Sequence, residues 1–237
     1  MKRSLTNLVR QAMDCCLPPL VRDNYYFMYP FYQYWFAGSP DIAAVINFKE
    51  VVQSMNDQEL ASFYGQIRCR ANTRPTDCSE ESLLWVTDRL GEADDIHTLL
   101  DVGCGRGFCL ERFARLGYVV TGCDVAKQLR SGIAPFVAGS VERLPFADNS
   151  FDVVTCFHTA EHVRNLTMAL EELKRVARQH LFVIVPCQRY FRYTLDLHIH
   201  FFYSSAYFAS FLGILDHECE LVGGDIVYHA RLSHTHR

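Results

Sequence analysis

The chain has 237 residues, of which 49% are hydrophobic and 21% are charged, and its formal net charge is −4. This length and composition favour one globular α/β domain with an accessory segment, and they argue against two full domains or a disordered chain. The small excess of acidic residues does not indicate a positively charged surface for nucleic acid. The ten cysteines lack the paired spacing of a zinc site. We therefore expect reduced thiols in a cytoplasmic protein.

The first 75 residues carry short helical patterns broken by prolines and show no strand alternation. We expect residues 1–75 to form a helical cap. Within this cap, "YYFMYPFYQYWF" (residues 25–36) has nine aromatic side chains among twelve. It could pack in the core of the cap, line an acceptor pocket as a lid with Tyr29 and Tyr32, or contact a membrane surface.

Residues 76–237 show strands and helices in alternation, which predicts an α/β domain with a Rossmann-like, doubly wound, mostly parallel sheet. A helix is expected over residues 78–91, and helical patterns follow the first and fourth predicted strands. Strands are predicted at residues 97–103, 118–124, 135–139, 151–157 and 181–186, with two more joined at Gly223 and Gly224. The uncharged stretch 197–215 predicts a buried helix rather than a membrane span.

A glycine-rich loop follows the first predicted strand in "LLDVGCGRGFC" (residues 99–109). Its pattern is Asp-x-Gly-x-Gly-x-Gly, whereas the dinucleotide fingerprint would require glycine at position 108, where this chain has Phe108. Such a loop can bring backbone amides close to a ligand at the start of the next helix. Taken alone, it could equally be a turn that only packs.

Asp124 ends the second predicted strand, where a carboxylate can accept hydrogen bonds from both hydroxyls of a ribose. A solvated loop aspartate is the alternative. The stretch "SVERLPFADNSFDVVTCF" (residues 140–157) adds a loop and the fourth strand beside it. Together, the three elements indicate a cofactor site at the carboxyl edge of the sheet.

With these motifs, residues 99–186 resemble the class I S-adenosylmethionine-dependent methyltransferases, in the group that includes the ubiquinone and menaquinone biosynthesis enzymes. The resemblance implies S-adenosylmethionine as cofactor, with the glycine loop at its methionine end and Asp124 on its ribose. The residues expected to bind it are Asp101, Gly103, Cys104, Gly105, Gly107, Asp124, Val125, Ser140, Val141 and Phe157. Three features depart from the family pattern: Ser140 replaces an aspartate, the Asp124–Ser140 connection is short enough to stunt the second helix, and no Pro-Gly-Gly turn precedes the fifth strand.

Acceptor chemistry in such folds comes from the segments after the fourth and fifth strands. His158, His162 and Glu161 are candidates for a general base, although Glu161 and His162 could equally cap and pack a helix start. Side chains that could bind a polar acceptor are Arg189, Tyr190, Arg192, Tyr193, His198 and His200. We expect no metal, because His198 and His200 have no acidic or cysteine partner nearby in the sequence.

These features predict a methyltransferase that acts on a small-molecule or lipid- or sugar-linked acceptor, with oxygen as the favoured acceptor atom. The alternatives are a non-catalytic cofactor-binding protein that recognises a partner, and an RNA methyltransferase. The sequence predicts no transmembrane segment.

Overall fold

The computed structural model describes residues 16–67, 75–93, 95–129, 132 and 134–232. The chain divides into two compact units. Among the described residues, a helical unit contains those up to Asp77 together with Arg189–Ile199, and a sheet unit contains those of Cys78–Gln188 together with those from His200 onward. The sequence predicts a single division near residue 75. It does not anticipate that Arg189–Ile199 leaves the sheet unit after its fifth strand and joins the helical unit.

The sheet unit is built on one seven-stranded sheet with the order β3-β2-β1-β4-β5-β7-β6. The strands are β1 Thr98–Val102, β2 Val119–Asp124, β3 Phe136–Ala138, β4 Phe151–Phe157, β5 Ala177–Pro186, β6 His217–Val222 and β7 Asp225–Arg231. The strands β1 to β5 pair in parallel, while β7 runs antiparallel to both β5 and β6. The predicted mostly parallel sheet is confirmed, as are the final two strands joined at Gly223 and Gly224.

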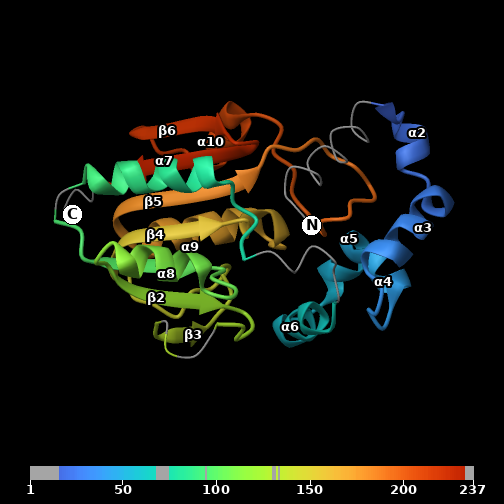
Figure 1. Ribbon diagram of the computed structural model, residues 1–237, viewed down its shortest axis with the longest axis horizontal. Coiled ribbons are helices and arrows are strands. Elements are labelled where there is room, and N and C mark those ends of the chain that lie inside the picture. The colour runs from blue at the N-terminus through green and yellow to red at the C-terminus, as the bar shows by residue number, and fades with distance from the viewer. Residues whose placement is uncertain (1–15, 68–74, 94, 130–131, 133, 233–237) are drawn as a thin grey trace. The chain divides into compact units, whose positions relative to one another are not determined.

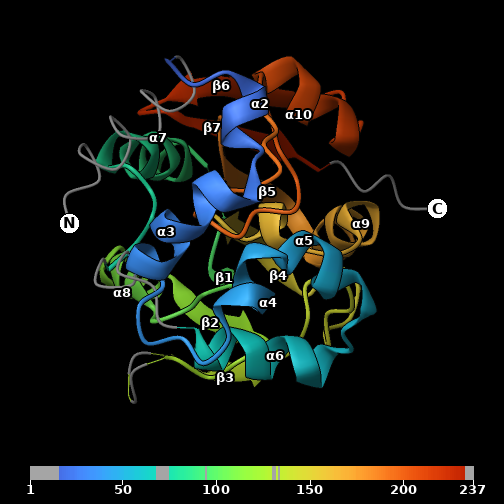
Figure 2. The ribbon, with the colours of Figure 1, turned by 90° about the vertical axis from the view of Figure 1, so that its right-hand side faces the viewer.

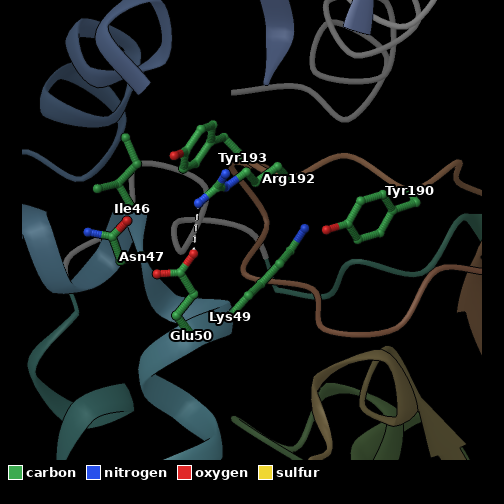
Figure 3. Close-up of a pocket in the computed structure, with 7 residues that line it drawn as sticks. All are labelled: Ile46, Asn47, Lys49, Glu50, Tyr190, Arg192 and Tyr193. Carbon is green, nitrogen blue, oxygen red and sulfur yellow. Dashed lines mark hydrogen bonds and ion pairs between the residues drawn. The ribbon is translucent and has the colours of Figure 1, made fainter. Parts of the chain in front are cut away.

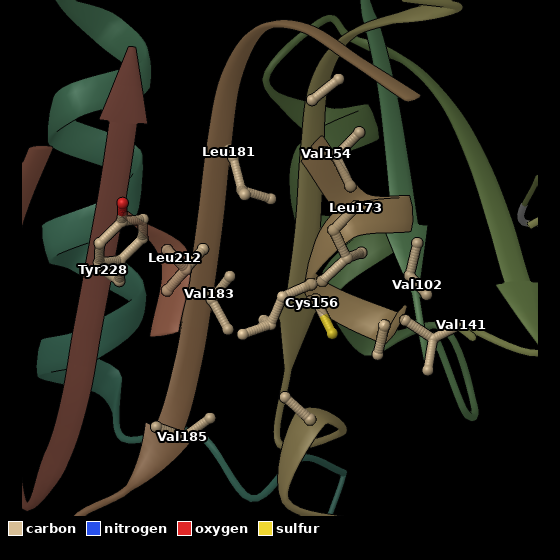
Figure 4. Close-up of a cluster of buried hydrophobic side chains, with 14 of the residues drawn as sticks. Val102, Val141, Val154, Cys156, Leu173, Leu181, Val183, Val185, Leu212 and Tyr228 are labelled. Carbon is tan, nitrogen blue, oxygen red and sulfur yellow. The ribbon is translucent and has the colours of Figure 1, made fainter. Parts of the chain in front are cut away.

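Helices cover both faces of this sheet (Figure 1). The helices α7 Glu80–Gly91 and α8 Phe108–Arg115 share one hydrophobic cluster with β1, β4 and β5. The helices α9 Leu166–Val176 and α10 Ser205–Leu212 share another. Figure 4 shows Leu173 and Leu212 beside Val154 and Val183 of the central strands. Burial on both faces explains why β4 and the second half of β5 are buried at consecutive positions rather than at alternate ones.

Asp152 ties three strands together at the amino ends of β4 and β1. Its carboxylate accepts hydrogen bonds from the backbone amides of His97 (3.0 Å) and Thr98 (2.9 Å), and from Arg178 on β5. Burial alone would raise the pKa of this carboxyl, but the Arg178 guanidinium and the two amides outweigh burial and hold the pKa below its usual value.

Two elements differ in extent from their predictions. The strand β5 begins at Ala177, whereas the sequence predicts it from residue 181, because the backbone becomes extended directly after α9. The helix α10 is confined to Ser205–Leu212 and buries only Phe208 and Leu212, so the buried helix predicted over 197–215 is wrong in extent. Between Asp124 and Ser140, none of the described residues is helical, in line with the short connection. Within the described ranges, no helix is long and apolar enough to cross a membrane.

The described part of the helical unit consists of short helices, seen in Figure 2. They are α2 Pro19–Arg22, α3 Tyr25–Trp35, α4 Ile42–Ile46, α5 Phe48–Val51, η1 Val52–Ser54 and α6 Asp57–Gln66. Asparagine or aspartate caps three of them: the side chains of Asn24, Asp41 and Asn56 accept from amides in the first turns of α3, α4 and α6.

The aromatic segment forms α3 and has two contrasting faces. Met28, Tyr32 and Phe36, spaced four residues apart, are buried in the core of the helical unit, and the Tyr32 hydroxyl donates to the carbonyl of Thr194. Tyr26 and Tyr34 are largely exposed. One face of the segment therefore packs, as one of the predicted alternatives requires.

We expect Tyr32→Phe to lower the free energy of unfolding of the helical unit by about 1–3 kcal/mol, because it removes the hydrogen bond to the buried Thr194 carbonyl. Tyr34→Phe, on the exposed face of the same helix, should change it by less than about 0.5 kcal/mol. Urea unfolding followed by tyrosine and tryptophan fluorescence would measure both. Equal effects of the two substitutions would contradict the packing interpretation.

Candidate cofactor-binding site

The glycine loop uses three positive φ angles to turn from β1 into α8. The φ values are +75° at Gly103, +50° at Gly105 and +84° at Gly107, a region that side-chain-bearing residues rarely adopt. A Cβ atom on Gly103 would lie 2.0 Å from the Thr159 hydroxyl oxygen, whereas one on Gly105 would meet nothing within 4 Å. Gly103 thus allows the loop to lie against Thr159, and the loop at Gly105 borders open space that a ligand can enter.

Asp124 joins the end of β2 to this loop. One of its carboxylate oxygens accepts from the Gly105 amide at 2.9 Å, and the other accepts from the Ala126 amide at 3.2 Å. Burial raises the pKa of this carboxyl, although the amide hydrogen bonds oppose the change. The carboxylate is therefore held at the carboxyl edge of the sheet, beside the glycine loop.

A second carboxylate, Asp101, lies within β1 and is 3% exposed. The Thr155 hydroxyl donates to it at 2.8 Å. Burial raises the Asp101 pKa to about 7, the Thr155 hydrogen bond opposes this, and the negative charge of Asp124 adds to it. Two neighbouring carboxyl groups disfavour each other's ionisation, and a positive charge placed beside them would favour their ionised forms.

The remaining residues predicted to bind the cofactor lie near the ends of the neighbouring strands. Val141 is buried in one core cluster, and the Phe157 ring is buried in the other, 6.3 Å from that of Phe113. The Ser140 hydroxyl accepts from the Glu142 amide. Cys104, within the loop, is buried, and burial raises the pKa of its thiol.

Glu142 is a residue of this edge that the sequence does not single out. Its carboxylate accepts from the backbone amides of Arg164 (2.7 Å) and Asn165 (3.0 Å), which precede α9. This fixes the loop after β3 against the loop after β4. In the sequence, the one sign of this role is that an acidic residue directly follows Val141.

His158 lies between two buried carboxylates. Its Nδ1 is 3.3 Å from Glu161 Oε1, its Nε2 is 3.3 Å from Asp225 Oδ1, and its backbone is left-handed with φ +47°. Both carboxylates are almost fully buried, and the His158 side chain is 14% exposed. Burial alone would lower the pKa of the ring, but the hydrogen bonds with Asp225 and Glu161 outweigh it and raise the pKa well above its usual value of about 6.5.

This geometry gives no support to the prediction that His158 acts as a general base. A base needs a neutral ring with one nitrogen directed at the acceptor, whereas here both nitrogens face carboxylates that favour the imidazolium form. Glu161 is fully buried in the short helix η3 Ala160–His162. The His162 side chain is 27% exposed, and its Nε2 lies 3.9 Å from the Glu161 carboxylate. Of the two histidines among the three base candidates, His162 is thus the more exposed.

Asp225 extends this group of charges to α7. It begins β7, opposite Pro186 at the end of β5, and its second oxygen accepts from the Ser79 amide (3.2 Å) and the Ser82 hydroxyl (3.0 Å) at the start of α7. Nothing in the sequence around Asp225 marks it as a partner of His158, because 66 intervening residues separate them and only strand order brings them together.

Part of the sheet unit is similar to known proteins. Residues 100–185 match the family described as "Methyltransferase domain". The sheet unit therefore contains, over residues 100–185, a methyltransferase domain of the class I type. This family uses S-adenosylmethionine as its methyl donor.

Among similar proteins, the malonyl-[acyl-carrier protein] O-methyltransferase of Erwinia billingiae is 31% identical over 134 residues, covering 53% of this chain and 51% of its own. The demethylmenaquinone methyltransferase of Paenarthrobacter aurescens is 39% identical over 87 residues, covering 34% of each chain. The crystal structure of an S-adenosylmethionine-dependent methyltransferase from Aquifex aeolicus matches the fold with a TM-score of 0.54 and 22% identity, covering 68% of this chain and 94% of its own. The chain spans between about a third and a half of the length of the curated relatives that it matches first.

The residues predicted to bind the acceptor fall into both units. Tyr29 and Tyr32 belong to the helical unit, together with Arg189, Tyr190, Arg192, Tyr193 and His198 of the excursion. His200 belongs to the methyltransferase domain, where its Nε2–H donates to the Val163 carbonyl at 2.9 Å and burial lowers its pKa. His200 therefore supports the loop after β4, and Tyr32 is engaged in packing.

We expect the charge on His158 to stabilise the methyltransferase domain in a pH-dependent way. Because the folded-state pKa of the ring is raised, its contribution is complete below the unfolded pKa of about 6.5 and is lost as pH rises through the folded pKa. His158→Gln should lower the free energy of unfolding by about 3–5 kcal/mol at pH 6, because two buried carboxylates lose their cation. The difference from the unsubstituted protein should shrink toward pH 9.

Urea unfolding at pH 6, 7.5 and 9 would measure this difference, with His217→Gln as the matched substitution of an exposed histidine. Besides Glu161 and Asp225, the thiol of Cys78 acts electrostatically on His158. Cys78→Ala in the same series separates its influence. A His158→Gln effect that does not depend on pH would show that the imidazole stabilises by packing alone.

Proposed function

We propose that this chain transfers the methyl group of S-adenosylmethionine to an oxygen atom of a small-molecule or carrier-linked acceptor. The observation that carries the proposal is the Asp124 carboxylate, held against the amide of Gly105 at the carboxyl edge of a class I methyltransferase domain. Ligands of open α/β sheets bind at this edge.

The residues present fit this cofactor. Gly105 borders open space at the start of α8, Asp124 can accept from the ribose hydroxyls, and Asp101 adds negative charge for the cationic end. When bound, the cofactor supplies a methyl group on a positively charged sulfur. Two buried carboxyl groups beside the loop favour such a charge, and they would favour it less once the methyl group has left and the sulfur is neutral.

The contribution of this chain to the reaction is then mainly alignment. A nucleophilic oxygen held roughly 3–3.5 Å from the methyl carbon gains most of the available acceleration without a strong base. Where the acceptor hydroxyl needs its proton removed, His162 is the histidine for this role, since both nitrogens of His158 face carboxylates.

Our proposal for the class of acceptor rests on the names of the similar proteins. The matched proteins of Erwinia billingiae and Paenarthrobacter aurescens are named for a malonyl group on an acyl-carrier protein and for demethylmenaquinone. Both are organic acceptors rather than nucleic acids, which agrees with the net charge of −4. Incubating the protein with isotopically labelled S-adenosylmethionine and a cell extract should place the label in the small-molecule or lipid fraction. Label in RNA would overturn the acceptor class, and no label in any fraction would favour a non-catalytic binding protein.

We expect Asp124→Ala to weaken the binding of S-adenosylhomocysteine by about 2–4 kcal/mol, because the ribose loses two charge-assisted hydrogen bonds. Titration calorimetry would measure this, with Asp88→Ala, an exposed aspartate on α7, as the matched control. Asp124→Asn keeps an acceptor for the Gly105 amide and separates the loss of charge from a loosened loop. Unchanged affinity in a folded Asp124→Ala variant would reject the assigned role.

A further inference from the structure

Two cysteines, Cys78 and Cys109, lie next to each other in the core of the sheet unit. They are 7% and 8% exposed, and both belong to the hydrophobic cluster around α7 and α8. The two thiols hydrogen-bond with each other, and the structure holds both in the reduced form. Sulfur atoms in such a contact need only a small movement to reach the separation of about 2.05 Å that a disulfide requires.

The backbones that carry these thiols are held side by side by a separate contact. Cys78 directly precedes the N-cap residue of α7, and Cys109 is the second residue of α8. Arg112, three residues after Cys109, pairs with Glu80, the first residue of α7, at 2.7 Å. The starts of the two helices are therefore neighbours independently of the thiols, and a disulfide would cross-link them.

The two thiols differ in their electrostatic surroundings. The hydrogen bond with Cys78 and burial raise the pKa of the Cys109 thiol well above its usual value, and the charge of Arg112 opposes this only in part. Cys78 interacts electrostatically with the ring of His158, and a positive charge on that ring favours the thiolate form. Because the thiolate is the form that reacts with oxidants, Cys78 is the expected attacking group and Cys109 the second thiol.

We propose that Cys78 and Cys109 are a modification site at which hydrogen peroxide forms a reversible disulfide, and that this disulfide weakens cofactor binding. The Cys78 thiolate attacks one peroxide oxygen, the O–O bond breaks, and hydroxide leaves and takes up the proton that Cys78 released, so that Cys78 becomes a sulfenic acid. The Cys109 sulfur then attacks the Cys78 sulfur, the S–O bond breaks, and the oxygen leaves as water with the Cys109 proton. The two thiols thereby lose two electrons, which reduce one peroxide to two waters.

The disulfide would act on the glycine loop because Cys109 follows that loop closely. The helix α8 begins directly after Gly107, and the amide of Gly105 donates to Asp124 at 2.9 Å. A disulfide is shorter than the contact of two hydrogen-bonded thiols, so its formation draws the starts of α7 and α8 together. This movement disturbs the loop at which the cofactor would bind. The effect on binding rests on the proposed function, whereas disulfide formation does not.

The cross-link is tested by treating the full chain with hydrogen peroxide, alkylating the remaining thiols and analysing a tryptic digest by mass spectrometry without reduction. Trypsin releases Cys78 within residues 71–89 and Cys109 within residues 107–112, and neither peptide contains a second cysteine. We expect the two peptides to be joined, and dithiothreitol to separate them. In Cys109→Ser, dimedone should label a sulfenic acid on Cys78. The matched control Cys219→Ser, at a half-buried thiol of β6, should cross-link like the unsubstituted protein.

The peroxide dose is set by reduced glutathione in the same solution, which must be converted to its disulfide. Absence of the joined peptides under that condition would overturn the proposal. So would a disulfide that joins either cysteine mainly to a different partner, or dimedone labelling of Cys109 rather than Cys78 in the unsubstituted protein.

Titration calorimetry with S-adenosylhomocysteine tests the effect on binding. We expect the oxidised protein to bind roughly tenfold more weakly than the reduced protein, a change equal to the loss of about one hydrogen bond, and dithiothreitol to restore the affinity. Cys78→Ser should keep the affinity of the reduced protein after peroxide treatment, and circular dichroism would verify that it is folded. Equal affinities of the oxidised and reduced proteins would overturn the effect on binding. No binding to the reduced protein would contradict the proposed function, and with it this effect, while the digest still decides the cross-link.

Discussion

Parallel pairing of β1 with both of its neighbours is the constraint on which the candidate cofactor site depends. The register sets Val102 beside Cys123 of β2 and Cys156 of β4, so the three strands end at the same level. The glycine loop after β1, Asp124 at the end of β2 and His158 after β4 consequently lie at one edge of the sheet. The antiparallel β7 contributes its beginning rather than its end to this edge, which is why Asp225 joins the group.

The charged side chains at this edge of the sheet form two groups that differ in their electrostatic partners. Beside the glycine loop, Asp101 and Asp124 are carboxyl groups without a cationic partner within the described part of the chain, and burial raises both pKa values. At the ends of β4 and β7, two carboxylates surround a histidine. In our proposal the first part receives a cationic ligand, whereas the second already holds a histidine between its carboxylates. Similar residue types thus serve different roles because of what lies within 3–4 Å of them.

The helical unit uses aromatic side chains both to pack and to surround a cavity. Its core combines α3 with Tyr193 and Leu197 of the excursion, so a segment that belongs by sequence to the methyltransferase part completes the other unit. The same excursion supplies Tyr190 and Arg192 to a cavity of about 380 Å³ beside Lys49, shown in Figure 3. The residues expected to bind an acceptor are concentrated here, which makes the helical unit the source of acceptor specificity in our proposal.

The sequence by itself determined the strands, the glycine loop and Asp124, because these depend on local patterns: continuous apolar runs, a glycine spacing and an acidic residue at a strand end. Four of the first five strands match their predicted ranges within one residue, and β5 begins earlier because no turn residue separates it from α9. The environment of His158 was decided only by the tertiary structure. Its position after β4 suggested a base, but its charge depends on Asp225, which strand order brings from a distant part of the chain. Packing likewise decided that residues 189–199 belong to the helical unit, because the sequence does not show which hydrophobic core an apolar side chain will join.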